Sequence, residues 1–177
     1  MTIATTAAPA EEHRLTALWA DLGDLSPARL HAVFRLRVDV FVVEQACAYA
    51  EIDGLDPIAR HLLVEDADTG QLAAYLRLLP PEAGGSTRLG RIVIAPARRG
   101  IGLGGYLVRE GLAEAERACP GRDVELSAQA HLLKFYRSHG FEAVSETYLE
   151  DGIPHIDMRK TAGILAAGRG TTGTIHP

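Results

Sequence analysis

Two spacings of apolar residues alternate along the chain and predict a protein built from strands and helices. Short β-branched or alternating stretches indicate strands, and apolar positions three or four residues apart indicate helices. The strand pattern covers residues 13–19, 61–66, 71–79, 89–95, 123–128, 141–149 and 153–158. The helix pattern covers residues 27–38 and 102–118 and a third segment around residues 132–136. For the short β-branched run 40–43, the pattern leaves open a strand or an irregular wall.

Turn and capping residues determine how these elements follow one another. Ser26-Pro27 is typical of an N-cap followed by proline at the first helical position. The tetrad 67–70 (Ala-Asp-Thr-Gly) predicts an antiparallel hairpin, and the turn 150–152 (Glu-Asp-Gly) predicts another near the end of the chain. We therefore expect an α/β fold with a mixed, mostly antiparallel, twisted sheet of six or seven strands and helices on both faces.

The length of 177 residues suits one domain. No internal repeat or linker-like stretch interrupts residues 12–160, so we expect a single domain there. Residues 1–11 are rich in Ala and Thr, and residues 161–177 are rich in Gly and Thr. Neither segment has apolar periodicity, which predicts a flexible N-terminus and a disordered tail.

Charge and cysteine content exclude several classes of partner. The net charge of -5 argues against nucleic acid, because phosphate binding needs a surplus of Lys and Arg on one face. No segment approaches the roughly 20 apolar residues of a membrane span, and no secretory signal is recognisable, so we expect no membrane partner and a cytoplasmic location. Cys47 and Cys119 lie in unrelated contexts without a C-x-x-C pattern, which predicts free thiols and no metal site.

The loop Arg99-Gly100-Ile101-Gly102-Leu103-Gly104 carries the strongest chemical signal. Glycines let backbone N–H groups converge on a phosphate, and the helix that follows adds its positive dipole end. A Walker A loop is excluded, because Gly105-Tyr106-Leu107 stands where Gly-Lys-Ser/Thr is needed. The dinucleotide pattern G-x-G-x-x-G is formally present. Residues 96–99, however, separate the strand from the first glycine, and no series of parallel strands precedes it.

Two blocks of sequence carry a family resemblance. The motif R/Q-x-x-G-x-G/A fits Arg99, Gly102 and Gly104, and residues 129–141 (QAHLLKFYRSHGF) follow one strand later. In this order and spacing the blocks resemble the GCN5-related N-acetyltransferase (GNAT) superfamily, which implies an acyl-CoA N-acyltransferase fold over residues 13–160. Further segments resemble its ElaA-like branch: residues 35–45 (RLRVDVFVVEQ), Tyr49, Asp53-Gly54, Asp56, His61, residues 128–131 (AQAH) and residues 150–155 (EDGIPH).

The resemblance implies that acetyl-CoA is the co-substrate and that the main chain supplies most of its binding groups. The backbone of Ile92, Val93 and Ile94 would pair with the pantetheine arm. The amides that would hold the pyrophosphate belong to Arg99, Gly100, Ile101, Gly102, Leu103 and Gly104. Gln129 stands where an asparagine is usual in the superfamily, and its amide would bind the coenzyme arm.

Acyl transfer to an amine requires a donor for the leaving thiolate and a base for the acceptor. Tyr136 matches the superfamily's helix tyrosine, and an ordinary pKa of about 10 keeps its hydroxyl protonated at neutral pH. The candidate bases are Glu44, His61, His131 and His155. Glu44 lies in an apolar stretch where burial would raise its pKa, and His155 lies on the last hairpin. These two are retained as catalytic candidates with Tyr136, and the sequence does not decide between them.

These features predict an enzyme that moves an acetyl group from acetyl-CoA to an amine by direct attack in a ternary complex. Neither cysteine adjoins a recognisable base motif, which disfavours a covalent route. A non-catalytic acyl-CoA sensor and a dinucleotide-dependent enzyme are the alternatives. The acceptor is expected to be a small-molecule or peptide amine that the sequence does not specify, and a homodimer is left open.

Overall fold

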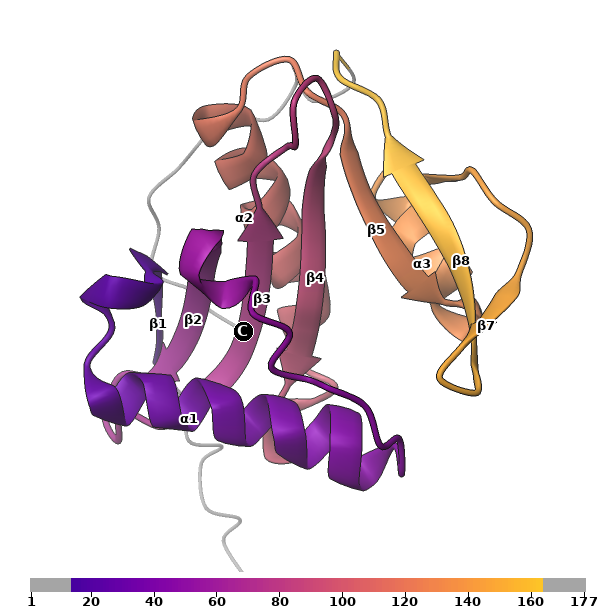
Figure 1. Cartoon of the computed structure of the whole chain (residues 1–177). Helices are drawn as coiled ribbons and strands as arrows, with labels where there is room; N and C mark the ends of the chain where they lie inside the picture. Colours follow the sequence, from indigo (N-terminus) through magenta and orange to yellow (C-terminus); the bar gives the residue numbers. More distant parts are fainter. Residues whose placement is uncertain (1–13, 164–177) are drawn as a thin grey trace, which may run out of the picture.

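The computed structural model describes residues 14–163, whose strands form one mixed sheet with helices on both faces (Figure 1). The spatial order is β1-β2-β3-β4-β5-β8-β6, and β7 pairs with β8. All paired strands are antiparallel except β4 and β5. The strands are β1 (Leu15–Asp21), β2 (Arg60–Asp66), β3 (Leu72–Leu79), β4 (Thr87–Ile94), β5 (Val124–Gln129), β6 (Glu142–Ala143), β7 (Tyr148–Glu150) and β8 (Ile153–Lys160). The predicted fold class is confirmed. The sheet has eight strands because the predicted strand 141–149 divides into β6 and β7.

Three α-helices accompany the sheet: α1 (Pro27–Arg37), α2 (Leu103–Ala118) and α3 (Leu133–Ser138). The Ser26 hydroxyl accepts the N–H of Arg29 at 3.3 Å, which confirms the predicted cap of α1. Directly after α1, the chain continues as a π-helix over Val38–Glu44. The run 40–43 is therefore neither a strand nor an irregular wall. Burial of Val40 against the sheet outweighs the β propensity of the run.

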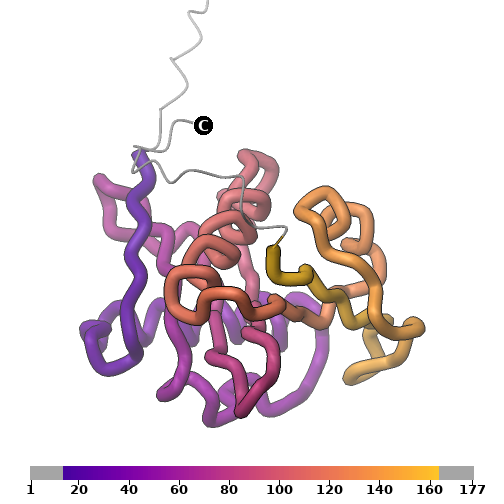
Figure 2. The backbone as a smooth tube through the Cα atoms, turned by 90° about the horizontal axis from the view of Figure 1, so that it is seen from above, coloured from indigo at the N-terminus to yellow at the C-terminus, as the bar shows by residue number. Residues whose placement is uncertain are grey.

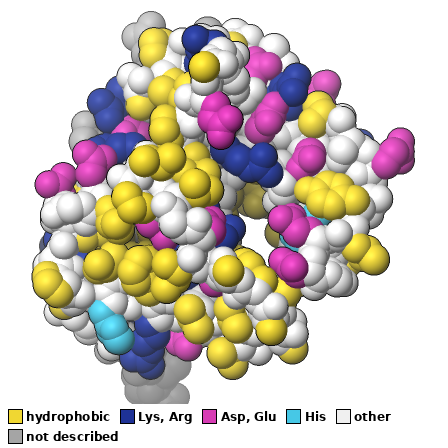
Figure 3. Space-filling view, in the orientation of Figure 1, with side chains coloured by type: hydrophobic (Ala, Val, Ile, Leu, Met, Phe, Trp, Pro, Cys, Tyr) yellow, Lys and Arg dark blue, Asp and Glu magenta, His cyan; other side chains and the backbone are white. Residues whose placement is uncertain are grey.

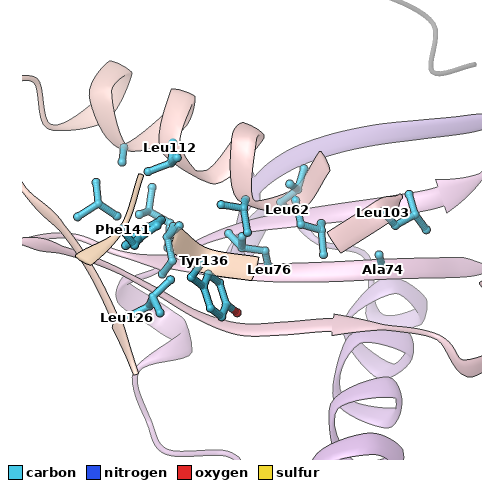
Figure 4. Packing of buried hydrophobic residues seen from close by; sticks show 14 of the residues in the cluster. Leu62, Ala74, Leu76, Leu103, Leu112, Leu126, Tyr136 and Phe141 are labelled. Atoms are coloured by element: carbon cyan, nitrogen blue, oxygen red, sulfur yellow. The ribbon is translucent and has the colours of Figure 1, made fainter. Parts of the chain in front are cut away.

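Two apolar layers lie on opposite faces of the sheet, because successive strand residues point in opposite directions. In β2, the buried Leu62 belongs to the layer under α2, whereas the buried Leu63 belongs to the layer under α1. Figure 4 shows the α2 layer, in which Leu62 and Leu76 lie beside Tyr136 and Phe141 from the C-terminal part of the chain. This layer therefore contains residues from both the N-terminal and the C-terminal strands of the sheet.

The parallel strands β4 and β5 are joined at one end only. Their register contains two residue pairs, Thr87 with Val124 and Arg88 with Glu125, and the Thr87 N–H also donates to the Asp123 carbonyl at 2.9 Å. Beyond Arg88 the strands diverge (Figure 1), and the view from above separates the β1–β4 half from the orange and yellow half (Figure 2). Within residues 14–163, the β5-facing edge of β4 past Arg88 has no strand partner.

A β-bulge lies in β4 at the point where the two strands diverge. The β3–β4 register shifts between Tyr75 and Arg77, so that one residue of β3 faces two of β4. Arg91, inside the bulge, has a φ of 51°, a left-handed conformation that non-glycine residues rarely adopt. The bulge bends β4 and thereby helps to direct its free edge into the space beside β5.

Parts of the predicted domain limits fall outside the description. The predicted flexible segment 1–11 and most of the predicted tail 161–177 are not among the described residues. Within the described part, the Ala162 N–H donates to Asp123 Oδ1 at 2.8 Å. No helix within residues 14–163 is both long and apolar enough to cross a membrane. The cytoplasmic location stays a prediction.

Candidate active site

The predicted coenzyme loop lies where β4 ends and α2 begins. A turn of 3-10 helix over Pro96–Arg98 leads into it, and Gly100 and Gly102 follow with φ angles of 83° and 85°. Glycine adopts this left-handed conformation without steric cost, which explains why glycines stand at both positions. Gly102 is the N-cap of α2, so the helix begins one residue later than the sequence pattern predicts. Gly102 is exposed and Gly104 is half-buried.

The loop presents a series of backbone donors that have no protein acceptor. The N–H groups of residues 100–105 donate to no acceptor within the described chain. The first hydrogen bond of α2 runs from the Tyr106 N–H to the Gly102 carbonyl at 3.2 Å. Unpaired N–H groups at a helix start, together with the helix dipole, favour an anion. The loop therefore has the geometry of a phosphate-binding site.

The residues predicted to hold the coenzyme arm lie on both sides of the space between β4 and β5. Ile92 and Ile94 pack toward the α2 layer, and Val93 packs toward the α1 layer, which leaves the backbone edge of this stretch unpaired. Gln129 ends β5 on the opposite side, and its Nε2 donates to Gln45 Oε1 at 3.2 Å. An extended arm between these strands would meet backbone groups on one side and an amide on the other.

Tyr136 lies on α3, next to the start of α2. The neighbouring Phe135 packs against Gly104 of α2: a Cβ added to Gly104 would lie 3.5 Å from the Phe135 ring. Burial raises the pKa of Tyr136 to about 12, so the hydroxyl stays protonated. Figure 4 shows this hydroxyl pointing away from Phe141. It has no hydrogen-bond partner among residues 14–163, and its oxygen keeps some exposed surface.

His155 faces Gln129 across the β5–β8 pairing. Its Nδ1 lies 2.9 Å from the Ile153 carbonyl, which can only accept, so Nδ1 carries the proton in the neutral ring. The ring is therefore held in the tautomer that leaves Nε2 with a free lone pair. The side chain is 15% exposed. These features suit a base beside the end of β5.

The predicted burial of Glu44 is wrong. The side chain is 44% exposed, and its Oε2 pairs with Arg99 Nη2 at 2.8 Å. The π-helix accounts for this, because its wider turn directs Val40 into the core and leaves Glu44 at the exposed C-terminal end. Glu44 thus contacts Arg99 of the predicted coenzyme loop instead of occupying an apolar pocket.

The other two candidate bases differ in exposure. His61 is buried, with Nδ1 at 2.7 Å from the Tyr75 hydroxyl and Nε2 at 3.0 Å from the Asp56 carbonyl. Burial lowers the pKa of His61, and both ring nitrogens are occupied, so its part is structural. His131 is exposed on the turn that follows β5.

Sequence reasoning did not find the large ion-pair network beside the bulge. Six charged side chains take part, and each carboxylate is shared by two guanidinium groups. Arg37 pairs with Glu51 at 2.8 Å and with Asp56 at 2.7 Å, and Arg77 pairs with Asp53 at 2.6 Å. The remaining pairs are Arg77–Asp56 at 3.0 Å, Arg91–Glu51 at 2.7 Å and Arg91–Asp53 at 3.0 Å. Arg37, Asp53 and Asp56 of this network are among the residues that resemble the ElaA-like branch. Their structural role is to hold the segment 49–56 against β3 and β4.

The α1 face of the molecule is hollowed between the two halves of the sheet, with basic, acidic and histidine side chains around the hollow (Figure 3). Val124, Leu126 and Ala128 of β5 belong to the α2 layer, so the alternate residues of the strand point to the α1 face. On that face, Asp157 accepts hydrogen bonds from Ser127 at 2.5 Å and from the Tyr148 hydroxyl at 2.9 Å. The α1 face of β5 and β8 is therefore polar at this point.

No group of three or more His, Cys, Asp or Glu side chains in residues 14–163 is placed to hold a metal ion. Cys47 and Cys119 are free thiols, as predicted. The elements that the site does present are an anion-binding loop, an unpaired strand edge and a buried tyrosine hydroxyl. Together with the sheet order, they are the features of the acyl-CoA N-acyltransferase fold.

Comparisons with known proteins agree with this class. Residues 31–162 match the family model of the acetyltransferase (GNAT) domain, so the chain belongs to the GNAT acetyltransferase family, whose members transfer acyl groups from acyl-CoA. Protein ElaA of Escherichia coli is 42% identical over 147 residues, which cover 80% of this chain and 95% of ElaA.

Solved structures give the same assignment. The crystal structure of an acyl-CoA N-acyltransferase from Pseudomonas aeruginosa superimposes with a TM-score of 0.78 at 47% identity, over 83% of this chain and 99% of that one. The crystal structure of Escherichia coli ElaA superimposes with a TM-score of 0.77 at 38% identity, over 82% and 99% of the two chains. The suspected resemblance to the ElaA-like branch is confirmed.

Proposed function

We propose that this protein transfers an acetyl group from acetyl-CoA to the amine of an acceptor, by direct attack while both substrates are bound. The observation that carries the proposal is the row of unpartnered N–H groups over residues 100–105, directly beside the unpaired edge of β4. The loop would hold the pyrophosphate, and β4 would pair with the pantetheine arm. Gln129, at the end of β5, would face that arm.

Tyr136 would stabilise the leaving thiolate. A coenzyme thiol has a pKa of about 8.5, well below the pKa of about 12 that burial gives Tyr136. Complete proton transfer would thus be uphill by about 5 kcal/mol, and burial of the thiolate in the site reduces that gap. The hydroxyl therefore acts mainly by donating a hydrogen bond as the C–S bond breaks, and solvent supplies the proton once the thiolate departs.

His155 would remove the proton from the acceptor. An alkylamine with a pKa of about 10.4 is neutral in only about 1 molecule in 2,500 at pH 7, which costs about 4.6 kcal/mol. Ile156 and Met158 of β8 belong to the α2 layer, so the alternate residue His155 lies on the α1 face, from which the acceptor would approach. The amine would attack the thioester carbonyl, lose its proton to Nε2, and keep the acyl group after the thiolate leaves.

The test is release of free coenzyme thiol from acetyl-CoA in the presence of a panel of amines, with binding followed separately by calorimetry. We expect binding of acetyl-CoA and thiol release with at least one class of amine. Binding without release for any amine would instead support a non-catalytic acyl-CoA sensor. Faster release from a longer acyl-CoA would correct the choice of acetyl group and leave acyl transfer intact.

A further inference from the structure

The last residue of the π-helix and the three residues after it bridge the gap between the two halves of the sheet on the α1 side. We call Glu44–Cys47 the strap. Glu44 pairs with Arg99 at 2.8 Å on the β4–α2 side. Gln45 accepts from Gln129 at 3.2 Å on β5, and Cys47 Sγ donates to the Asp151 carbonyl at 3.5 Å in the turn between β7 and β8. Two of the three groups that the strap contacts are residues assigned to the coenzyme.

The backbone of the strap is fixed independently of these side-chain contacts. The N–H groups of Gln45 and Cys47 donate to Val40 and Val42 at 3.2 Å and 3.1 Å. Ala46 has a φ of 50°, a left-handed conformation that costs an alanine about 1 kcal/mol or more. A strained residue at the end of a π-helix often marks a functional position. The strap is therefore a defined turn that presents Glu44 and Gln45 toward the coenzyme groove.

Glu44 offers Arg99 the same chemistry that a phosphate would. A carboxylate and a phosphate both present anionic oxygens to the N–H groups of a guanidinium. Arg99 Nη2 is occupied by Glu44, and its Nε points to the Ile94 carbonyl at 3.4 Å. A pyrophosphate held by the loop N–H groups would lie beside this guanidinium and compete for it, and the Glu44 carboxylate would repel its charge.

We propose that Glu44 is an internal competitor of the coenzyme pyrophosphate: it neutralises Arg99 in the empty protein and is replaced when the coenzyme binds. This inference rests on the proposed function, since it requires the pyrophosphate to lie on the loop. In the same exchange, Gln129 Nε2 would leave the side-chain oxygen Oε1 of Gln45 and donate to the coenzyme arm. Glu44 is thus a residue that sets coenzyme affinity, in place of the base suggested by the sequence.

The experiment compares the dissociation constant of coenzyme A for the native chain and for Glu44→Gln by titration calorimetry. Exposed ion pairs contribute about 0.2–1 kcal/mol, so Glu44→Gln should bind coenzyme A about 1.4- to 5-fold more tightly. In the Arg99→Ala background the same change should give a smaller gain, because the competition for Arg99 is lost and only the charge repulsion remains. S-acetylpantetheine, which has no pyrophosphate, should bind both proteins equally.

Glu82→Gln is the matched control, because it also removes one exposed negative charge but lies in the loop before β4, with no ion pair within residues 14–163. It should leave the affinity unchanged. Equal or weaker binding by Glu44→Gln, or the same gain in the Arg99→Ala background, would overturn the proposal. Failure of the native chain to bind coenzyme A at all would overturn the proposed function itself, which keeps the two outcomes separate.

Discussion

Arg91 combines an unfavourable backbone conformation with unusually well-partnered charge. Its φ of 51° would suit a glycine, yet its guanidinium pairs with Glu51 and Asp53 and lies 5.6 Å from the centre of the Tyr49 ring. The side chain thus offsets a local backbone cost and holds the segment 49–56 against β4. Because both effects act at a single position, substitutions can separate them.

We expect Arg91→Gly to be more stable than Arg91→Ala by about 1 kcal/mol, because both lose the ion pairs but glycine accepts the positive φ. Urea unfolding of the two variants measures this difference. At Arg88, in ordinary extended backbone of the same strand, the order should reverse, with alanine more stable than glycine by about 0.5–1 kcal/mol. The same order at both positions would contradict the bulge.

Tyr136→Phe isolates the chemistry of the hydroxyl. Because this hydroxyl has no hydrogen-bond partner within the described chain, its removal should leave the melting temperature and coenzyme affinity nearly unchanged. Turnover should fall by roughly 10²-fold, the usual contribution of a positioned proton donor. Thiol release and calorimetry on the same preparation measure both quantities. Full turnover in Tyr136→Phe would remove this residue from the mechanism.

At the scale of elements, the β4–α2 junction could be predicted almost completely from the sequence. The glycine spacing, the preceding strand and the apolar face of the following helix are all local, and local patterns specify local structure. The π-helix and the exposure of Glu44 could not be predicted in this way. The residues around Glu44 are apolar, but which of them turn inward depends on contacts with β2–β4, far away in the sequence.

The two loop glycines should respond differently to alanine. Gly102→Ala places a side chain at a φ of 85° and should lower the free energy of unfolding by about 1 kcal/mol. It should also weaken the binding of coenzyme A several-fold, because the loop N–H groups shift. Gly104→Ala puts a Cβ in ordinary contact with Phe135 at 3.5 Å and Ile94 at 3.6 Å. Stability should stay equal or rise by up to about 1 kcal/mol, with affinity kept within about twofold.

Thermal unfolding and calorimetry with coenzyme A test both variants. Equal losses for the two would mean that the loop excludes any side chain, which is not what the geometry and the G/A position of the motif indicate. If only Gly104→Ala lost coenzyme A binding, the pyrophosphate would lie closer to Gly104 than to Gly102.

At the scale of the whole molecule, the ion-pair network was beyond sequence reasoning for a simple reason. Its partners lie far apart along the chain: Arg37 meets Asp56, and Arg77 meets Asp53. No periodicity links such positions, so the family resemblance identified several of these residues without indicating their contacts. Tyr136, His155 and Gln129 were likewise named from motifs. Strand pairing places His155 opposite Gln129, and the packing of α3 places Tyr136 near the start of α2.

Buried titratable groups make stability depend on pH. Burial lowers the pKa of His61, so between its lowered value and about 6.5 the unfolded chain binds a proton that the folded chain does not. The free energy of unfolding should therefore fall as pH drops from 7 to 5, by at most about 1.4 kcal/mol per pH unit from this group. The hydrogen bond from Arg77 lowers the pKa of Asp53, so its contribution is present above about pH 4 and lost at lower pH.

Urea unfolding at pH 7, 6 and 5 measures the slope. His61→Gln should flatten it, whereas substitution of the exposed His31 by glutamine should leave it as in the native chain. Identical slopes in all three proteins would show that protonation of His61 is not linked to unfolding.

The brief pairing of β4 with β5 has a consequence for solubility. Open strand edges usually lie at the rim of a sheet, where they invite pairing with other chains and aggregation. Here an open edge lies in the interior of the sheet, flanked by the β5–β8 half and bridged by residues 44–47. A strand from another protein could reach this edge only if its side chains fitted between the β5–β8 half and residues 44–47. A thin, flexible chain without side chains meets no such obstacle. The arrangement therefore keeps backbone groups available to a small molecule while withholding them from neighbouring proteins.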